Sequence, residues 1–308
     1  MAKITQTTRR EFLIQVGGLG VLLSGPSGLL AQERLPTRAI PGTAETLPVI
    51  GFGSSKPVLE IPTEGTEPVA AVIRMLLEHG GRVVDTSPRE PADIDAQFGR
   101  VLVEPDIRDN IFLATKINTP DAEAGIAQMR RTQRLFGRRT MDLIQVESLV
   151  GLDAHWPRLR EWKDSGEARY VGVTVSSYFR FDALESFMRA ESPDFVHINY
   201  SPLEPRAAER LLPLAQDMGM AVIINRPFMN GTYFGQVAGR ELPEWTAEFD
   251  CATWAQFSLK YILAQPAVTC VLTETTNPEH MEENIQAGFG RLPDEATQRR
   301  MRELVADF

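Results

Sequence analysis

Short apolar segments rich in valine and isoleucine alternate with segments of helical periodicity along most of this chain. The candidate strands are residues 48–52, 82–85, 111–116, 142–147, 170–174, 195–199, 221–225 and 268–272. Continuous apolar runs of this length are typical of strands buried on both faces of a parallel sheet. The helical patterns between them cover about 67–79, 93–103, 121–137, 156–166, 180–190, 205–218, 250–264 and 278–288. This alternation predicts an α/β fold with a single (β/α)8 TIM barrel.

The first of these helices shows why the pattern favours a barrel with an outer ring of helices. Val69, Ile73 and Leu76 fall on one helical stripe, and Gly80-Gly81 follows as an end signal. A doubly wound open sheet is the alternative architecture. No Gly-x-Gly-x-x-Gly follows an early strand, which counts against a dinucleotide-binding sheet of that kind.

Length, charge and cysteine content exclude several classes of protein. The 308 residues suffice for one large domain or two small ones. The formal net charge of -9 makes duplex nucleic acid a poor partner, because its phosphates repel an acidic surface. Two cysteines, Cys251 and Cys270, do not form a disulfide framework. We therefore expect a small-molecule ligand or substrate.

The N-terminal segment has the pattern of an export signal. Thr8-Arg9-Arg10-Glu11-Phe12-Leu13 matches the twin-arginine motif, a weakly apolar stretch follows over residues 14–30, and Ala31 is a small residue suited to cleavage. This layout predicts a signal peptide over residues 1–31, recognised by the twin-arginine export machinery, and a barrel over residues 32–308. The expected location is the bacterial periplasm or the cell exterior. An uncleaved membrane anchor is the alternative.

Polar residues stand where the predicted strands end. In a (β/α)8 barrel the functional site lies at the C-terminal ends of the strands. The residues at these ends are Asp85, Lys116, Glu147, Thr174 with Val175, Asn199 with Tyr200, and Arg226. Each alone is better explained as a solvated loop boundary, but together they predict a polar site at one rim of the barrel.

Seven motifs in this order resemble those of the aldo/keto reductase family. They are Ile40–Ser54, Val84–Ser87, Phe112–Lys116, Asp142–Glu147, Tyr170–Thr174, Ile224–Phe228 and Pro278–Asn284. The likeness covers about residues 38–290 and is greatest to bacterial members with twin-arginine signals. The resemblance implies a TIM barrel with an N-terminal β-hairpin. It also implies hydride transfer between a nicotinamide cofactor and a carbonyl group.

The catalytic tetrad that the resemblance implies is degenerate in this chain. The family uses a tyrosine as proton donor, a lysine and an aspartate that tune it, and a histidine that orients the substrate. The aspartate corresponds to Asp85 and the lysine to Lys116, whereas Glu90 stands at the tyrosine position and Glu147 at the histidine position. No tyrosine precedes Tyr170 in the chain, so a shift of register does not restore the donor.

Three interpretations of the acidic replacements remain open. Carboxylates clustered around Lys116 raise at least one carboxyl pKa, so Glu147 or Glu90 is a candidate surrogate acid. Glu147 is alternatively the partner of Lys116 in a structural ion pair. A metal site of clustered carboxylates is the third interpretation, which the nearby lysine disfavours, and we predict no metal.

The cofactor positions implied by the resemblance are also altered. Thr174-Val175 replaces a Ser-Asn pair that holds the carboxamide, and His197 replaces a glutamine. Glu274 and His280 stand where a lysine and an arginine grip the adenosine 2'-phosphate. A carboxylate repels that phosphate by about 1 kcal/mol or more at contact, so NADH is favoured over NADPH. The remaining cofactor candidates are Asn225, Arg226, Thr275, Glu283 and Asn284; the alternative is that such residues cap the last helix and its loops.

Two functions remain on the sequence alone. One is an NAD(P)H-dependent reductase of a carbonyl or conjugated double bond, with glutamates in place of the usual histidine and tyrosine. The other is a catalytically inactive exported barrel that binds a small molecule or a partner protein. The absence of a cofactor is an alternative to NAD(P)H, since no pool of free reduced nicotinamide is evident outside the cytoplasm. The long connection over residues 229–249 carries Tyr233, Phe234 and Trp245 and predicts a lid, with Trp156 as a further candidate at its mouth.

Overall fold

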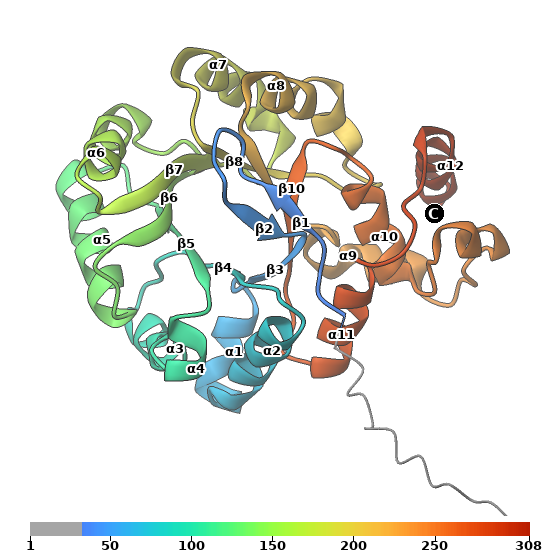
Figure 1. Ribbon diagram of the computed structural model, residues 1–308, viewed down its shortest axis with the longest axis horizontal. Helices are drawn as coiled ribbons and strands as arrows, with labels where there is room; N and C mark the ends of the chain where they lie inside the picture. The colour runs from blue at the N-terminus through green and yellow to red at the C-terminus, as the bar shows by residue number, and fades with distance from the viewer. Residues whose placement is uncertain (1–32) are drawn as a thin grey trace, which may run out of the picture. The chain divides into compact units, whose positions relative to one another are not determined.

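A closed parallel barrel forms the centre of the computed structural model, which describes residues 33–308 (Figure 1). Its strands follow one another around the barrel in sequence order. They are β3 (Ile50–Gly53), β4 (Val83–Asp85), β5 (Phe112–Ile117), β6 (Met141–Glu147), β7 (Ala168–Thr174), β8 (Phe195–Asn199), β9 (Ala221–Asn225) and β10 (Val268–Thr273). Strand β10 pairs with β3 through Val271–Ile50 and closes the barrel. The predicted TIM barrel is confirmed, whereas the predicted signal peptide lies outside the described residues.

Helices surround the barrel and cover the outer face of its strands (Figure 1). Those close to the predicted ranges are α2 (Glu67–Glu78), α3 (Asp93–Leu102), α5 (Ala122–Leu135), α6 (Leu152–Asp164), α7 (Phe181–Glu191), α8 (Leu211–Met218), α10 (Trp254–Leu263) and α11 (Pro278–Gln286). The sequence patterns did not reveal α1 (Pro57–Glu64), α4 (Pro105–Arg108), α9 (Thr232–Val237) or α12 (Glu295–Ala306). Within the described part of the chain, no helix is long and apolar enough to cross a membrane.

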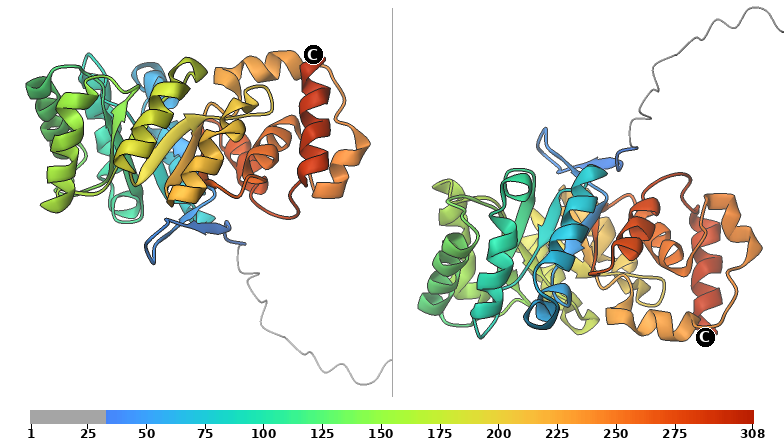
Figure 2. Two further views of the ribbon diagram at one scale, coloured as in Figure 1. Left: turned by 90° about the horizontal axis from the view of Figure 1, so that it is seen from above. Right: turned by 90° about the horizontal axis from the view of Figure 1, so that it is seen from below.

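An antiparallel hairpin closes the N-terminal end of the barrel (Figure 2). Its strands are β1 (Thr37–Ala39) and β2 (Thr46–Pro48), paired from Thr37–Pro48 to Ala39–Thr46. Leu47 is fully buried against the apolar side chains that fill the barrel interior, among them Phe112 and Phe195. The Arg38 guanidinium donates to the carbonyl of Gln265 at 2.9 Å and so ties the hairpin to the segment before β10. The apolar filling therefore occupies this end and leaves the opposite rim to polar residues.

The segment predicted as a lid is largely folded. It forms a 3-10 turn (Met229–Gly231), helix α9 and a second 3-10 turn (Glu244–Phe249). Tyr233 is buried and its hydroxyl donates to the carbonyl of Trp254 at 2.9 Å. Trp245 packs against Phe257 at 6.1 Å between ring centroids. Both aromatic residues therefore serve packing, while Phe234 keeps 42% of its surface exposed.

Candidate active site

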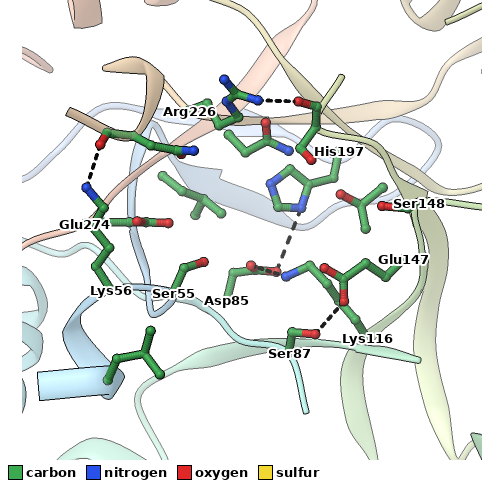
Figure 3. Close-up of a pocket in the computed structure, with 16 residues that line it drawn as sticks. Ser55, Lys56, Asp85, Ser87, Lys116, Glu147, Ser148, His197, Arg226 and Glu274 are labelled. Carbon is green, nitrogen blue, oxygen red and sulfur yellow. Dashed lines mark hydrogen bonds and ion pairs between the residues drawn. The ribbon is translucent and has the colours of Figure 1, made fainter. Parts of the chain in front are cut away.

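The C-terminal ends of the barrel strands surround a polar cavity of about 350 Å³ (Figure 3). The predicted site residues that line it are Asp85, Lys116, Glu147, Thr174, His197, Asn225 and Arg226. They come from six consecutive strands, β4 to β9, because parallel strands of a closed barrel end at one rim. Of the strand-end residues named from the sequence, Val175, Asn199 and Tyr200 do not line this cavity; all three are buried. Trp156 is not part of it, since this buried side chain of α6 donates from Nε1 to Glu191 Oε2 at 2.8 Å.

Lys116 and Asp85 form a buried ion pair at the floor of the cavity. Lys116 Nζ donates to Asp85 Oδ2 and, at 3.1 Å, to the carbonyl of Thr86. Gln145 Nε2 donates to the second oxygen, Asp85 Oδ1, at 3.3 Å. Burial raises the pKa of the Asp85 carboxyl, and the neighbouring Lys116 ammonium opposes that shift. An ammonium carries three N–H groups, so one donor of Lys116 remains for a ligand in the cavity.

Glu147 is held by a hydroxyl group and not by the lysine. Ser87 Oγ donates to Glu147 Oε2 at 2.6 Å, and Asn118 Nδ2 lies 3.3 Å from the same Ser87 oxygen. Within residues 33–308 no ion pair joins Glu147 to Lys116, whose carboxylate partner is Asp85. The interpretation of Glu147 as a structural partner of Lys116 is therefore wrong. Nor does the described part of the chain contain a group of three histidine, cysteine or acidic residues that could hold a metal ion.

Glu90 lies apart from the other acidic residues. Its carboxylate accepts from Arg131 Nη1 at 2.6 Å, its side chain is 67% exposed, and it does not line the cavity. The preceding residue, Arg89, turns inward and donates to the carbonyl of Ser54 at 2.9 Å and to Asp95 Oδ1 at 3.2 Å. The structure thus brings Asp85 and Glu147 near Lys116 but not Glu90. None of the five tyrosines of the chain lines the cavity.

His197 is a buried imidazole without a hydrogen-bond partner. It is 2% exposed, and within the described residues neither ring nitrogen has a hydrogen-bond partner. Its Nδ1 lies 3.9 Å from Asp85 Oδ1, which is beyond hydrogen-bond distance. Burial lowers the pKa of His197 well below its ordinary value, and the charge of Lys116 acts in the same direction. The ring is therefore neutral near pH 7 and faces the cavity with its hydrogen-bonding capacity unused.

Asn225 and Arg226 also line the cavity, and Arg226 lies on the far side of it from Lys116 and Glu147 (Figure 3). Asn225 Nδ2 donates to the carbonyl of Val175 at 3.1 Å, while its Oδ1 has no partner among the described residues. Arg226 has a left-handed backbone with φ of 53°, and its Nη1 donates to the carbonyl of Ser176 at 2.7 Å. A non-glycine residue in this region costs on the order of 1 kcal/mol or more, and such strain is typical of ligand sites.

A second cavity of about 530 Å³ contains the predicted adenosine-side residues. Thr275, His280, Glu283 and Asn284 line it together with the aromatic residues Phe228, Phe234 and Trp254. The alternative that these residues cap the last helix fails for Glu283 and Asn284, since the N-cap of α11 is Asn277. Thr275 does support the start of this helix, because its hydroxyl oxygen accepts from the backbone N–H of Asn277 at 3.0 Å. Arg240 is the one lysine or arginine among the lining residues, and its guanidinium lies 3.9 Å from the ring centroid of Phe308.

Glu274 joins the two cavities. It lines both of them and also a hollow of about 80 Å³ between them, where Lys56 and Arg226 supply positive charge. Desolvation raises the pKa of Glu274, a hydrogen bond from Ser55 opposes the shift, and water at this exposed side chain screens the effect. Lys56 Nζ donates to the carbonyl of Asn230 at 2.5 Å across the hollow. The two cavities and this hollow therefore form one groove with a basic middle section.

This groove fits a dinucleotide. Unpartnered polar atoms of His197 and Asn225 lie at one end, aromatic side chains lie at the other, and Lys56 and Arg226 lie between them where a diphosphate would pass. Sequence reasoning missed Lys56, Ser87 and Trp254. Lys56 and Ser87 each follow the end of a barrel strand by two or three residues. Their position just beyond a strand end is the signal by which they could have been found.

Comparisons with known proteins agree with this architecture. The model of a family described as "Aldo/keto reductase family" matches residues 50–304. "Aldo-keto reductase str7" of Strobilurus tenacellus is 24% identical over 244 residues, 66% of this chain and 71% of the relative. "NADH-specific methylglyoxal reductase" of Escherichia coli is 25% identical over 173 residues, 48% of this chain and 52% of the relative, so the chain spans about half the length of that protein.

Solved structures share the fold at low sequence identity. An aldo-keto reductase from Bacillus halodurans in its holo form has a TM-score of 0.70 and 21% identity, covering 88% of this chain and 96% of that one. An aldo/keto reductase from Klebsiella pneumoniae, in complex with NADP and acetate, has a TM-score of 0.72 and 18% identity, covering 89% of this chain and 95% of that one. The chain thus shares the fold of these two proteins.

Proposed function

Since the chain belongs to the aldo/keto reductase family, we propose that it is an oxidoreductase that uses a nicotinamide cofactor to reduce a carbonyl group or a conjugated double bond. The observation that carries this proposal is the buried Lys116–Asp85 pair at the floor of a cavity that continues into a second one. A positive charge held at the end of an elongated groove suits a reaction in which negative charge develops on a substrate oxygen.

The residues of the cavity suggest how they divide the work. The nicotinamide, when bound, supplies the hydride. Lys116 stabilises the oxygen anion with its remaining N–H donor, and Asp85 keeps the ammonium in place. Glu147 is the acid that delivers the proton to this oxygen, and Ser87 fixes its carboxyl group in the cavity. In this proposal two of the four usual catalytic residues are replaced, and Glu90 has no part.

We also propose a preference for NADH. Glu274 and Glu283 border the second cavity, and a carboxylate repels a 2'-phosphate by about 1 kcal/mol or more near contact. Arg240 is the only lysine or arginine among the residues lining that cavity, and it already stacks on Phe308. The relative from Escherichia coli is described as NADH-specific, which agrees with this preference.

Export through the twin-arginine machinery is proposed from residues 1–31. Replacing Arg9 and Arg10 by lysine in the full chain is expected to keep the protein in the cytoplasm, as shown by fractionation and immunoblotting. Because that route is understood to carry folded proteins, the cofactor can be bound before export. Unchanged periplasmic accumulation of the double variant would refute the signal.

A catalytically inactive barrel is the second candidate, and one observation favours it. No tyrosine is among the described residues that line the cavity. The tyrosine that serves the family as proton donor therefore has no counterpart elsewhere in the cavity. This alternative predicts that Lys116→Met and Glu147→Ala variants keep the biological effect of the protein. Loss of that effect in variants that fold normally would exclude it.

Cofactor binding tests the proposed function directly. Trp254 lines the second cavity, so bound reduced nicotinamide is expected to quench protein fluorescence by energy transfer. We expect saturable quenching with NADH and weaker binding of NADPH, followed by oxidation of bound NADH when a carbonyl compound such as methylglyoxal is added. Absence of saturable binding of both nucleotides would contradict the proposal.

A further inference from the structure

We propose that His197 is a catalytic residue whose imidazole donates a hydrogen bond to the substrate oxygen that Lys116 also binds. This inference rests on the proposed reductase function, because it assigns the group that orients the carbonyl in that reaction. It differs from the sequence-based expectation, in which His197 is one of the cofactor-binding residues.

The ring is placed as a ligand-binding group is placed. His197 is 2% exposed, and within residues 33–308 both of its ring nitrogens lack a hydrogen-bond partner. Buried polar atoms of folded proteins are nearly always paired, so a ring of this kind requires a partner from outside the chain. His197 lines the cavity and its imidazole points into it (Figure 3). A bound molecule is therefore the expected partner.

The position of the ring identifies which part of a ligand it meets. One oxygen of Asp85 binds Lys116 Nζ, and the other lies 3.9 Å from His197 Nδ1. The ammonium and the imidazole thus flank the same carboxylate at the floor of the cavity. A single substrate oxygen above this carboxylate can accept from both, which fixes the carbonyl by two donors.

The neutral state of the ring suits this role. Burial and the charge of Lys116 both lower the pKa of His197, so the ring keeps one N–H without adding a second positive charge beside the ammonium. A neutral imidazole is an effective donor to a carbonyl or alkoxide oxygen. Other groups can bind the carboxamide of a nicotinamide. Asn225 Oδ1 has no hydrogen-bond partner within residues 33–308, and Thr174 lines the same cavity.

The His197→Phe variant separates the two roles. Phenylalanine keeps a ring at this position but makes no hydrogen bond, so whichever contact His197 makes is lost. We expect the NADH dissociation constant, measured by fluorescence quenching, to change by less than about twofold, and kcat/KM for methylglyoxal to fall at least about tenfold. Weakened NADH binding with unchanged kcat at saturating NADH would overturn the proposal.

If wild-type protein does not bind NADH, the proposed function fails and the inference fails with it.

A binding measurement covers the case in which NADH binds but methylglyoxal is not reduced. Acetate then serves as the probe, because its oxygen can occupy the place of the carbonyl oxygen in the complex with NAD⁺. We expect His197→Phe to weaken acetate binding at least about fivefold, the loss of one hydrogen bond, while NAD⁺ affinity stays unchanged. Equal acetate affinity of the two proteins would overturn the inference and leave the proposed cofactor binding intact.

Discussion

Glu147 accepts a hydrogen bond from the hydroxyl group of Ser87, with 2.6 Å between Ser87 Oγ and Glu147 Oε2. Both side chains line the cavity next to Lys116, as Figure 3 shows, yet the ammonium pairs with Asp85 instead. The glutamate is thus kept available on the wall of the cavity while another acid neutralises the lysine. Glu147 is therefore not the counter-ion of Lys116, which leaves its carboxyl group free for the role proposed for it above.

The first prediction concerns this glutamate. Glu147→Gln keeps the size of the side chain and its bond to Ser87 but removes the acidic proton, so we expect kcat to fall by about 10²-fold or more. NADH affinity should stay the same, because Glu147 does not line the second cavity. Steady-state kinetics and fluorescence titration measure the two effects.

Ser87→Ala is the matched control for Glu147→Gln. It leaves the acid in place and removes only the hydrogen bond that orients it, which is worth about 0.5–1.5 kcal/mol, so kcat should fall roughly tenfold at most. A Glu147→Gln variant as active as wild type would show that the proton comes from another group.

The second prediction concerns the stability of the buried ion pair. Lys116 and Asp85 are 7% and 5% exposed, so Lys116→Met leaves an unpaired carboxylate in the interior. We expect the free energy of unfolding to fall by about 3–5 kcal/mol, measured by urea denaturation. Adding Asp85→Asn removes the buried charge and should restore part of this loss. A double variant less stable than Lys116→Met would argue against the unpaired charge as the cause.

The sequence predicted the barrel well because its signals are local and repeated. Each strand is a continuous apolar run, and a closed parallel barrel brings the residue after each run to the same rim. That is why Lys116 and His197, 81 positions apart by their numbers, could be predicted to share one site. Helix α1 was missed because Pro57 and Pro62 interrupt its pattern.

The failure at Glu90 has a different cause. Spacing along a loop does not determine which of two neighbouring side chains turns inward. Here Arg89 turns inward because a carbonyl of Ser54 and the carboxylate of Asp95 both accept from it, and Glu90 is left to pair with Arg131 at the surface. Such partners come from distant segments, so only the folded chain reveals them.

The third prediction concerns the cofactor. Glu274→Gln removes the negative charge that borders both cavities but keeps the shape of the side chain. With about 1 kcal/mol of repulsion removed, NADPH affinity should rise about fivefold relative to NADH affinity. The ratio of the two dissociation constants, measured at constant ionic strength, tests this. An unchanged ratio would place the 2'-phosphate away from Glu274.

The fourth prediction concerns the dependence of stability on pH. Burial holds the pKa of His197 well below 6.5 in the folded protein, whereas the ring titrates near 6.5 in the unfolded chain. Below about pH 6.5 the unfolded chain therefore binds a proton that the folded protein does not, and stability is lost as the pH falls from there toward the folded pKa. The contribution is fully present above about pH 6.5.

The His197→Gln variant lacks this linkage and isolates it from the other titrating groups. One such group changes the free energy of unfolding by at most about 1.4 kcal/mol per pH unit. Urea denaturation at about pH 7.5 and about pH 5.5 should therefore show a larger loss of stability for wild type than for the variant, because only wild type has the buried neutral ring. Equal losses in the two proteins would mean that His197 accepts a proton in the folded state as readily as in the unfolded chain, and that the cavity around it is wetter than its 2% exposure indicates.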